Sequence, residues 1–134
     1  MENNKPQWQK RVDTTQYLYS SLIKNLKGDE LKTDFFNADN YNFDANQLKL
    51  LEYYSDHQDE IVKLFSANLG QNWTWERIPI MAQAILIVCY CEVIVLDTPI
   101  AVAIDQALVT AEKYGQLDNK KFINAILDKV LKKD

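Results

Sequence analysis

The sequence predicts an all-α fold, built as a single-domain helical bundle of five to seven helices. Only 3 Gly and 3 Pro occur in 134 residues, whereas β-sandwiches and barrels need turn residues every ~8 to 12 positions. Apolar residues recur three or four positions apart along most of the chain, which is the period of an amphipathic helix. A chain of this length with 47% hydrophobic residues forms one packed core without disulfides or metals, so residues 1–134 are expected to make one domain.

The first helix is predicted to begin at Pro6 and to end before Gly28. Proline suits the first turn of a helix, and residues 1–6 are expected to be flexible. The apolar stripe of this helix is predicted to contain Trp8, Val12, Thr15, Tyr19, Leu22 and Leu26. Asp29 then caps a short second helix that reaches Phe36.

A long third helix is predicted from Asp44 to Leu69, with a bend near Ser55. Asp44 and Gln47 have the spacing of a capping box, and Gly70 follows the last turn as a helix stop. The apolar stripe of this helix contains Leu48, Leu51, Tyr54, Gln58, Ile61, Phe65 and Leu69.

The segment from Ile78 to Leu96 is apolar on every side, with Gln83 and Glu92 as its strongly polar positions. Its 19 residues would span roughly 28 Å as a helix, so a membrane span and a buried bundle helix both have to be considered. Pro79, Glu92 and the amphipathic helices around it, which need an apolar partner, favour the buried helix. Pro79 is also expected to separate a short turn over residues 75–78 from the helix.

Two further helices complete the bundle. The first has Pro99 at its first helical position, is capped by the preceding Asp97 or Thr98, and is ended by Gly115. The last covers residues 119–132. It is capped by Asp118 or Asn119 and turns an apolar face inward, formed by Phe122, Ile123, Ile126, Leu127, Val130 and Leu131.

The charge is unevenly distributed. Residues 1–27 carry +3, residues 28–60 carry −7 and residues 118–134 carry +2, within a total of −4. If the two basic ends meet in space they form a phosphate-binding patch. The alternative is two separate, solvated, lysine-rich ends.

Residues for catalysis or metal binding are scarce. Cys89 and Cys91 are two apart on a helix, so their side chains diverge by about 200° and neither bridge nor form a ligand pair. His57 lies in a polar stretch and is read as a solvated helix residue. With no glycine-rich phosphate loop, we expect a cytoplasmic protein without enzymatic activity, metal or cofactor. A small enzyme or cofactor-binding bundle is the least favoured class.

Several blocks of the chain together resemble the NusB transcription antitermination family. The matching blocks, in the family's order and spacing, are Trp75–Ile78, Ala84–Leu86 ending in Glu92, Val102–Ala107 continuing through Lys113–Gly115, and Lys121–Asn124 continuing through Leu127–Lys129. In the N-terminal half the resemblance is confined to Gln9–Arg11 and Tyr17–Tyr19.

The resemblance implies an all-helical, bacterial, RNA-binding regulator of transcription rather than an enzyme. Such a protein joins the ribosomal protein NusE, binds the boxA element of nascent ribosomal RNA and acts in the antitermination complex of RNA polymerase. It has no membrane association, and a homodimer is an open alternative. The competing interpretation is a protein-interaction module derived from the family, with weakened or lost RNA binding.

The resemblance also implies site residues. RNA contacts are expected from Lys5, Lys10, Arg11, Lys120, Lys121 and Phe122, and protein-partner contacts from Tyr19, Glu76, Ala82 and Asp118. The family usually has three or more arginines near its start, so fewer phosphate contacts and a shallower salt dependence are expected here. The Phe122 ring is expected either to pack in the core or to stack on an unpaired base.

Two interpretations concern single side chains in the predicted core. Glu92 is the one carboxylate in the central apolar segment; it either ties helix ends together or marks a functional site, and the structural role is preferred. Trp73 and Trp75 flank one residue and so point in different directions. One of them is expected to fill the core and the other a surface groove.

Overall fold

The computed structural model describes residues 5–38 and 41–132, and these residues form seven α-helices and two 3-10 turns with no strand among them. The all-α prediction is therefore confirmed. In chain order the elements are α1 (Gln7–Ile23), α2 (Gly28–Phe36), α3 (Ala45–Asp56), α4 (Gln58–Ala67), η1 (Trp75–Arg77), α5 (Ile80–Leu96), α6 (Ile100–Lys113), η2 (Leu117–Asn119) and α7 (Lys120–Leu131).

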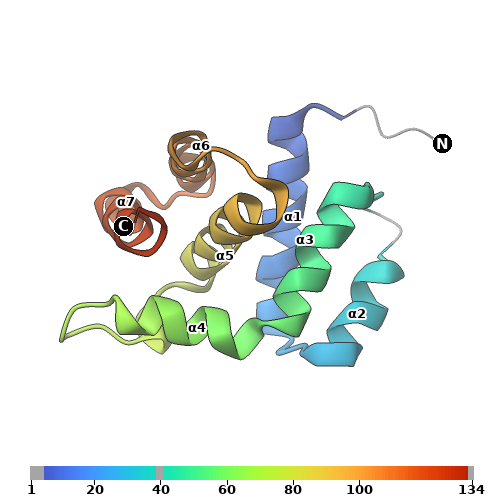
Figure 1. The fold of residues 1–134 in the computed structure, drawn as a ribbon, viewed down its shortest axis with the longest axis horizontal. Helices are drawn as coiled ribbons and strands as arrows, with labels where there is room; N and C mark the ends of the chain where they lie inside the picture. The colour runs from blue at the N-terminus through green and yellow to red at the C-terminus, as the bar shows by residue number, and fades with distance from the viewer. Residues whose placement is uncertain (1–4, 39–40, 133–134) are drawn as a thin grey trace.

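Helix α5 is the centre of the bundle. It packs against α1 and α3 on one side and against α6 and α7 on the other (Figure 1). Ten of its residues are buried, including an unbroken run from Ala82 to Cys89. The interpretation of this apolar segment as a core helix is confirmed. In the part of the chain that the structure describes, no helix is both long enough and apolar enough to cross a membrane.

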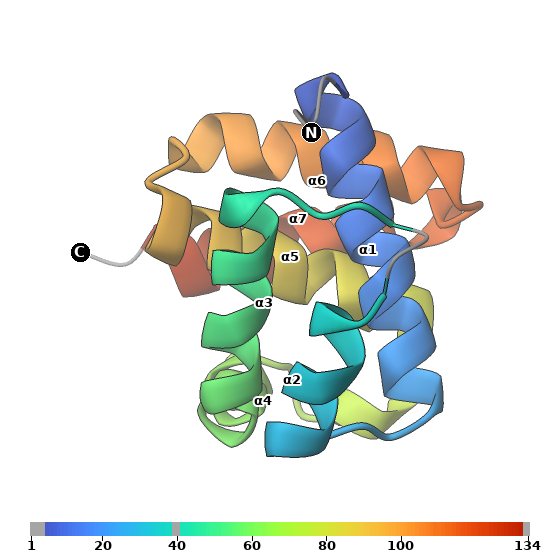
Figure 2. The same ribbon diagram turned by 90° about the vertical axis from the view of Figure 1, so that its right-hand side faces the viewer.

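The remaining helices cover α5 in two groups. Helices α2 and α3 lie side by side on one face of the molecule (Figure 2). Helices α6 and α7 pack against each other on the opposite side of α5 (Figure 1). Helix α1 packs on α5 and contributes Tyr17 and Leu18 to the core.

The segment predicted as one helix over residues 44–69 with a bend near Ser55 is two helices, α3 and α4, which are divided at His57, two residues from the expected bend. His57 has φ −127° and ψ 23°, outside the helical range, and its ring stacks on Tyr53 with centroids 4.1 Å apart. The two halves bury against different partners: α3 packs on α2 and α5, and α4 packs on α7 and η1. One straight helix cannot pack against both sets of neighbours, and Figure 1 shows α4 turning across the end of the bundle.

Helix α1 is shorter than its apolar stripe predicted. It ends at Ile23 because Asn25 adopts the left-handed conformation (φ 58°), and the amide of Leu26 donates a hydrogen bond back to the Ser21 carbonyl (3.0 Å). This bond satisfies an otherwise open helix-end carbonyl. At the other end Trp8, predicted on the buried stripe, is 54% exposed.

Several helix starts differ from their predicted caps. Pro99 is itself the N-cap of α6, and Asp97, two residues earlier, is the left-handed C-cap of α5 (φ 56°). Lys27, not Asp29, is the N-cap of α2. Asn119 is the N-cap of α7, as one of the two predicted candidates, but its side chain makes no capping bond.

The capping box of α3 is confirmed. Asp44 accepts a hydrogen bond from the Gln47 amide (2.8 Å), and Gln47 accepts one from the Asp44 amide (2.9 Å). Residues 1–4 of the expected flexible start lie outside the described residues. Lys5, in contrast, is held by an ion pair with Asp13 (2.7 Å).

Candidate RNA and partner surfaces

Arg11 is tied to the core. It lies on the second turn of α1, and its Nε donates hydrogen bonds to both carboxylate oxygens of Glu92 on α5, at 2.8 and 3.0 Å. The Thr98 hydroxyl donates a further bond to Glu92 (3.2 Å). Only 13% of the Arg11 side chain and 5% of the Glu92 side chain are exposed. These bonds fit the structural role preferred for Glu92.

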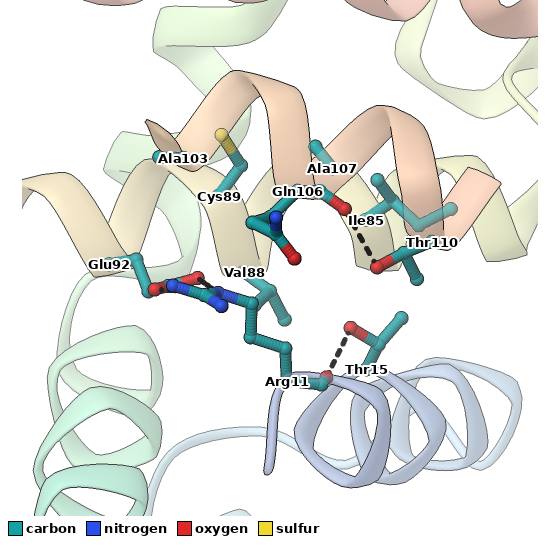
Figure 3. Close-up of a pocket in the computed structure, with 10 residues that line it drawn as sticks. All are labelled: Arg11, Thr15, Ile85, Val88, Cys89, Glu92, Ala103, Gln106, Ala107 and Thr110. Carbon is teal, nitrogen blue, oxygen red and sulfur yellow. Dashed lines mark hydrogen bonds and ion pairs between the residues drawn. The ribbon is translucent and has the colours of Figure 1, made fainter. Parts of the chain in front are cut away.

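The surroundings of this pair leave little room for a ligand. Figure 3 shows the Arg11 side chain reaching from α1 along the space between α1 and α6, with its guanidinium directed at Glu92. Gln106 and Thr110 of α6 line the same pocket. The Thr110 hydroxyl is used within α6, where it donates to the Gln106 carbonyl (3.0 Å).

The other two N-terminal cations also have acidic partners. Lys10 lies 2.9 Å from Asp44. Lys5 lies 2.7 Å from Asp13, and its ammonium also donates to the Tyr41 carbonyl (3.0 Å). Lys5, Lys10 and Arg11, the three N-terminal residues predicted to bind phosphate, therefore each form an ion pair with a carboxylate of this chain.

The ion pair with Lys10 also changes the pKa of Asp44. Burial raises the pKa of Asp44, but the hydrogen bonds from Lys10 and from the Gln47 amide, with the charge of Lys10, outweigh burial and lower it below its usual value. Asp44 is thus an ionised N-cap at neutral pH.

The C-terminal cations are less constrained. Lys120 lies 3.3 Å from Glu112 of α6 in a largely exposed pair, which is a weak interaction in water. Lys121 is exposed, and within residues 5–38 and 41–132 no carboxylate lies at ion-pair distance from its ammonium.

Phe122 has its ring between the core and the surface. It is partly buried and packs against the apolar core, and its ring stacks with that of Trp73 at a centroid distance of 5.2 Å and an interplanar angle of 29°. Trp73 is 44% exposed, whereas Trp75 is 7% exposed and lies in the core. The expectation that the two tryptophans divide between core and surface is confirmed, with Trp73 outside.

The two basic ends of the chain, considered above either as one phosphate-binding patch or as two separate ends, make different contacts. Helices α1 and α7 lie on opposite sides of α5 (Figure 1), and Phe122 contacts the loop before η1 through Trp73. Phe122 stacks on Trp73 and follows Lys121 in the chain, whereas Lys5, Lys10 and Arg11 lie against carboxylates of this chain.

The predicted partner residues are also scattered. Glu76 is exposed and lines a surface groove with Ile80, Leu22 and Leu26. Tyr19 is 36% exposed on α1, and Asp118 is exposed on η2. Ala82 is fully buried, so its expected contact with a partner is wrong, because its position on α5 faces the core.

The groove beside Glu76 was not foreseen from the sequence. It lies between the end of α1, the α3–α4 junction and the start of α5, and it contains Lys27 and Lys63 as well as apolar side chains. Ile80 in its lining is 39% exposed, and Ile23, which follows the lining residue Leu22 in the chain, is 55% exposed. Two apolar residues at helix ends were the available sequence signal. Ile23 is the last residue of α1 and Ile80 is the first of α5, and neither belongs to the buried face of its helix.

The two cysteines are buried in α5. Burial raises the pKa of the Cys89 thiol to about 12 and also raises that of Cys91, so both are inert thiols at neutral pH. Across residues 5–38 and 41–132, no cluster of three or more His, Cys, Asp or Glu side chains is placed to hold a metal ion.

Comparison with known proteins points to one family. The sequence profile of the NusB family matches residues 9–132. A transcription antitermination protein NusB from Finegoldia magna is 31% identical over 131 residues, with 93% of each chain covered. A NusB protein from Geobacillus kaustophilus is 38% identical over 76 residues. That alignment covers 56% of this chain and 58% of the relative, so the chain matches under two thirds of that relative's length.

Solved structures agree on the fold. NusB of T. maritima superposes with a TM-score of 0.79 at 22% identity, over 98% of this chain and 94% of that one. A conserved hypothetical protein from Mycoplasma genitalium, described as structurally homologous to NusB proteins, has a TM-score of 0.73 at 23% identity, over 95% and 100% of the two chains.

Proposed function

The chain belongs to the NusB family, and from that premise we propose that it is a cytoplasmic transcription antitermination factor that binds boxA-type single-stranded RNA together with the ribosomal protein NusE. In this role it binds and does not catalyse. It acts within the antitermination complex of RNA polymerase and in ribosomal RNA processing.

The observation that carries the RNA part is the start of α7. Lys121 is exposed and without a carboxylate partner among the described residues, and it adjoins Phe122, whose ring is partly exposed. An unpaired RNA segment is held by cations on its phosphates and aromatic rings against its bases. This surface offers both, next to Lys120, whose exposed pair with Glu112 costs little to break.

The N-terminal side contributes less to this proposal. Arg11, Lys10 and Lys5 each face a carboxylate, so an RNA phosphate must displace a partner that is already in place. We therefore expect weak RNA affinity for the isolated protein and a salt dependence that reflects few contacts.

The groove beside Glu76 is the proposed site for NusE. Its apolar lining, with Ile80 exposed at the edge, is the surface that a protein partner buries. Lys27, Lys63, Asp59 and Glu76 place both signs of charge around that lining, which orients a partner and increases the association rate.

A gel-shift titration with boxA RNA, with and without NusE, tests the RNA part. We expect binding in low salt, stronger with NusE, with log affinity falling against log salt at about 0.7 per phosphate contact. Lys121→Glu should weaken binding to all RNA sequences alike, because phosphate contacts position without specifying. Lys63→Glu, on the groove, is the matched charge reversal and should leave RNA affinity unchanged in the absence of NusE.

A specific observation favours a second candidate, a NusB-derived protein-interaction module. The N-terminal cations that would bind RNA are neutralised within the chain. If the folded protein binds no boxA RNA in low salt even with NusE present, this second function replaces the first.

Calorimetry with NusE tests the groove. Ile80→Asp should reduce NusE affinity at least tenfold, because it places a charge in the apolar contact. Val109→Asp changes an apolar side chain that is also exposed, 52% on α6, and should have no effect. Equal NusE affinity for Ile80→Asp and the unmodified protein would rule out this site.

A further inference from the structure

We propose that the exposed face of Trp73, backed by Phe122, is a stacking platform for an unpaired nucleic-acid base, with Arg77 and Lys121 binding the adjoining phosphates. The inference rests on the proposed RNA-binding function and names a part of the site that neither the charge pattern nor the family resemblance indicated.

The position of Trp73 is built by its loop. Its amide donates to the Gly70 carbonyl (3.1 Å), which closes a turn after α4. The Arg77 guanidinium donates through Nη1 to the Asn72 carbonyl (2.8 Å), and the Arg77 amide donates to the Thr74 carbonyl (3.0 Å). The loop is thus tied by hydrogen bonds on both sides of Trp73, and the ring itself stacks on Phe122.

The two rings form one layered unit. Phe122 packs against the core, and its ring stacks with that of Trp73, with centroids 5.2 Å apart and an interplanar angle of 29°. Trp73 still leaves 44% of its surface in water. A large ring supported from behind and exposed in front offers a base a rigid partner and loses little side-chain freedom when the base binds.

The charge around the rings favours a polyanion over an apolar protein segment. Arg77 is hydrogen-bonded to the residue before Trp73, and Lys121 precedes Phe122 in the chain; both are exposed. The carboxylate beside Arg77, that of Glu76, lines the groove on the α1 side, whereas the Arg77 guanidinium is held at the Trp73 loop. Each of the two segments that carry the rings therefore has an exposed cation: Arg77 is bonded to the residue before Trp73, and Lys121 is the residue before Phe122.

The sequence analysis named Phe122, not Trp73, as the aromatic ring that could stack on a base. Phe122 lies in the motif that resembles the family, but it is partly buried and its ring stacks on Trp73. Trp73, at 44% exposed, offers a base the more open ring. The contribution expected of Phe122 is therefore to support Trp73.

Fluorescence anisotropy with a 12-nucleotide unstructured RNA labelled with fluorescein tests the proposal in low salt. Trp73→Ala should weaken binding about 5- to 150-fold, the loss of one base stack, and Trp73→Phe should restore most of it. Trp8→Ala is the matched control, because Trp8 is 54% exposed on α1 and should leave affinity unchanged. Arg77→Gln should reduce the salt slope by about 0.7.

A second measurement does not depend on a destabilising variant. In Trp8→Phe protein, Trp73 is the tryptophan open to solvent and Trp75 is buried. Addition of unlabelled RNA should quench the fluorescence, and Trp73→Phe in the same background should abolish the quenching. Absence of quenching by a saturating RNA overturns the proposal.

The outcomes separate this inference from the function on which it rests. If the unmodified protein binds RNA and folded Trp73→Ala binds equally well, the platform is wrong and the RNA-binding function stands. If the folded, unmodified protein binds neither this RNA nor boxA RNA with NusE, both are overturned. If Trp73→Ala weakens NusE binding and leaves RNA binding intact, the surface serves a protein partner and the proposal is overturned.

Discussion

Arg11 and Glu92, 81 positions apart in the chain, form a largely buried ion pair in which one guanidinium nitrogen lies 2.8 and 3.0 Å from the two carboxylate oxygens. The pair joins the first turns of α1 to the last turns of α5, and the Thr98 hydroxyl adds a bond from the start of the next segment. An arginine that charge and resemblance placed in an RNA site is therefore part of the internal structure.

Removing one partner of this pair should destabilise the protein strongly. Arg11→Met leaves the Glu92 carboxylate buried and uncompensated, at a cost of about 3 to 5 kcal/mol in the free energy of unfolding. The double variant Arg11→Met with Glu92→Leu should lose clearly less. Urea denaturation measures both. Lys132→Met, in an exposed pair with Asp128, is the control and should change stability by less than about 0.5 kcal/mol. An equal loss of unfolding free energy in the single and the double variant would contradict an energetic coupling between Arg11 and Glu92.

The centre of α5 should be intolerant of cavities. Leu86 is fully buried, and Leu86→Ala should lower the unfolding free energy by about 2 to 5 kcal/mol, through lost burial and the cavity left behind. Val109→Ala, on the exposed face of α6, should cost less than about 0.5 kcal/mol. A loss below about 1 kcal/mol for Leu86→Ala, measured by chemical denaturation, would place this helix in a looser environment.

Acid should remove the contribution of Asp44. Its pKa in the folded state is lowered, because hydrogen bonds from Lys10 and Gln47 outweigh its burial. Because the pKa of Asp44 is lower in the folded than in the unfolded state, its stabilising contribution is fully present at a pH above the unfolded-state pKa, near 4. This contribution is lost as the pH falls through the folded-state pKa. Asp44→Asn should therefore show a smaller decrease in melting temperature than the unmodified protein between about pH 5 and 2. Parallel curves for the two proteins would rule out this role.

The two cysteines should resist modification. Burial raises the pKa of Cys89 to about 12 and raises that of Cys91 as well, so neither forms a thiolate at neutral pH. We expect almost no reaction with Ellman's reagent in native buffer and release of two equivalents in denaturant, which absorbance records. Rapid reaction of the native protein would show that α5 opens or is exposed.

The sequence by itself determined the features that depend on nearby residues. The apolar segment that became α5, the capping box of Asp44 and Gln47, and the short turn before Pro79 were all predicted, and the structure contains them. Each follows from periodicity or from side chains within four positions, which act whatever the rest of the chain does. The division of Trp73 and Trp75 between surface and core is of the same local kind.

The tertiary structure alone decided which distant groups meet. Glu92 as the partner of Arg11, Trp73 as the stacking partner of Phe122, and the burial of Ala82 depend on how helices pack around α5. The break at His57 depends on α3 and α4 burying against different neighbours. Helical periodicity indicates that a side chain faces inward or outward, but it carries no information on which helix faces it; that choice is made by close packing of the whole core.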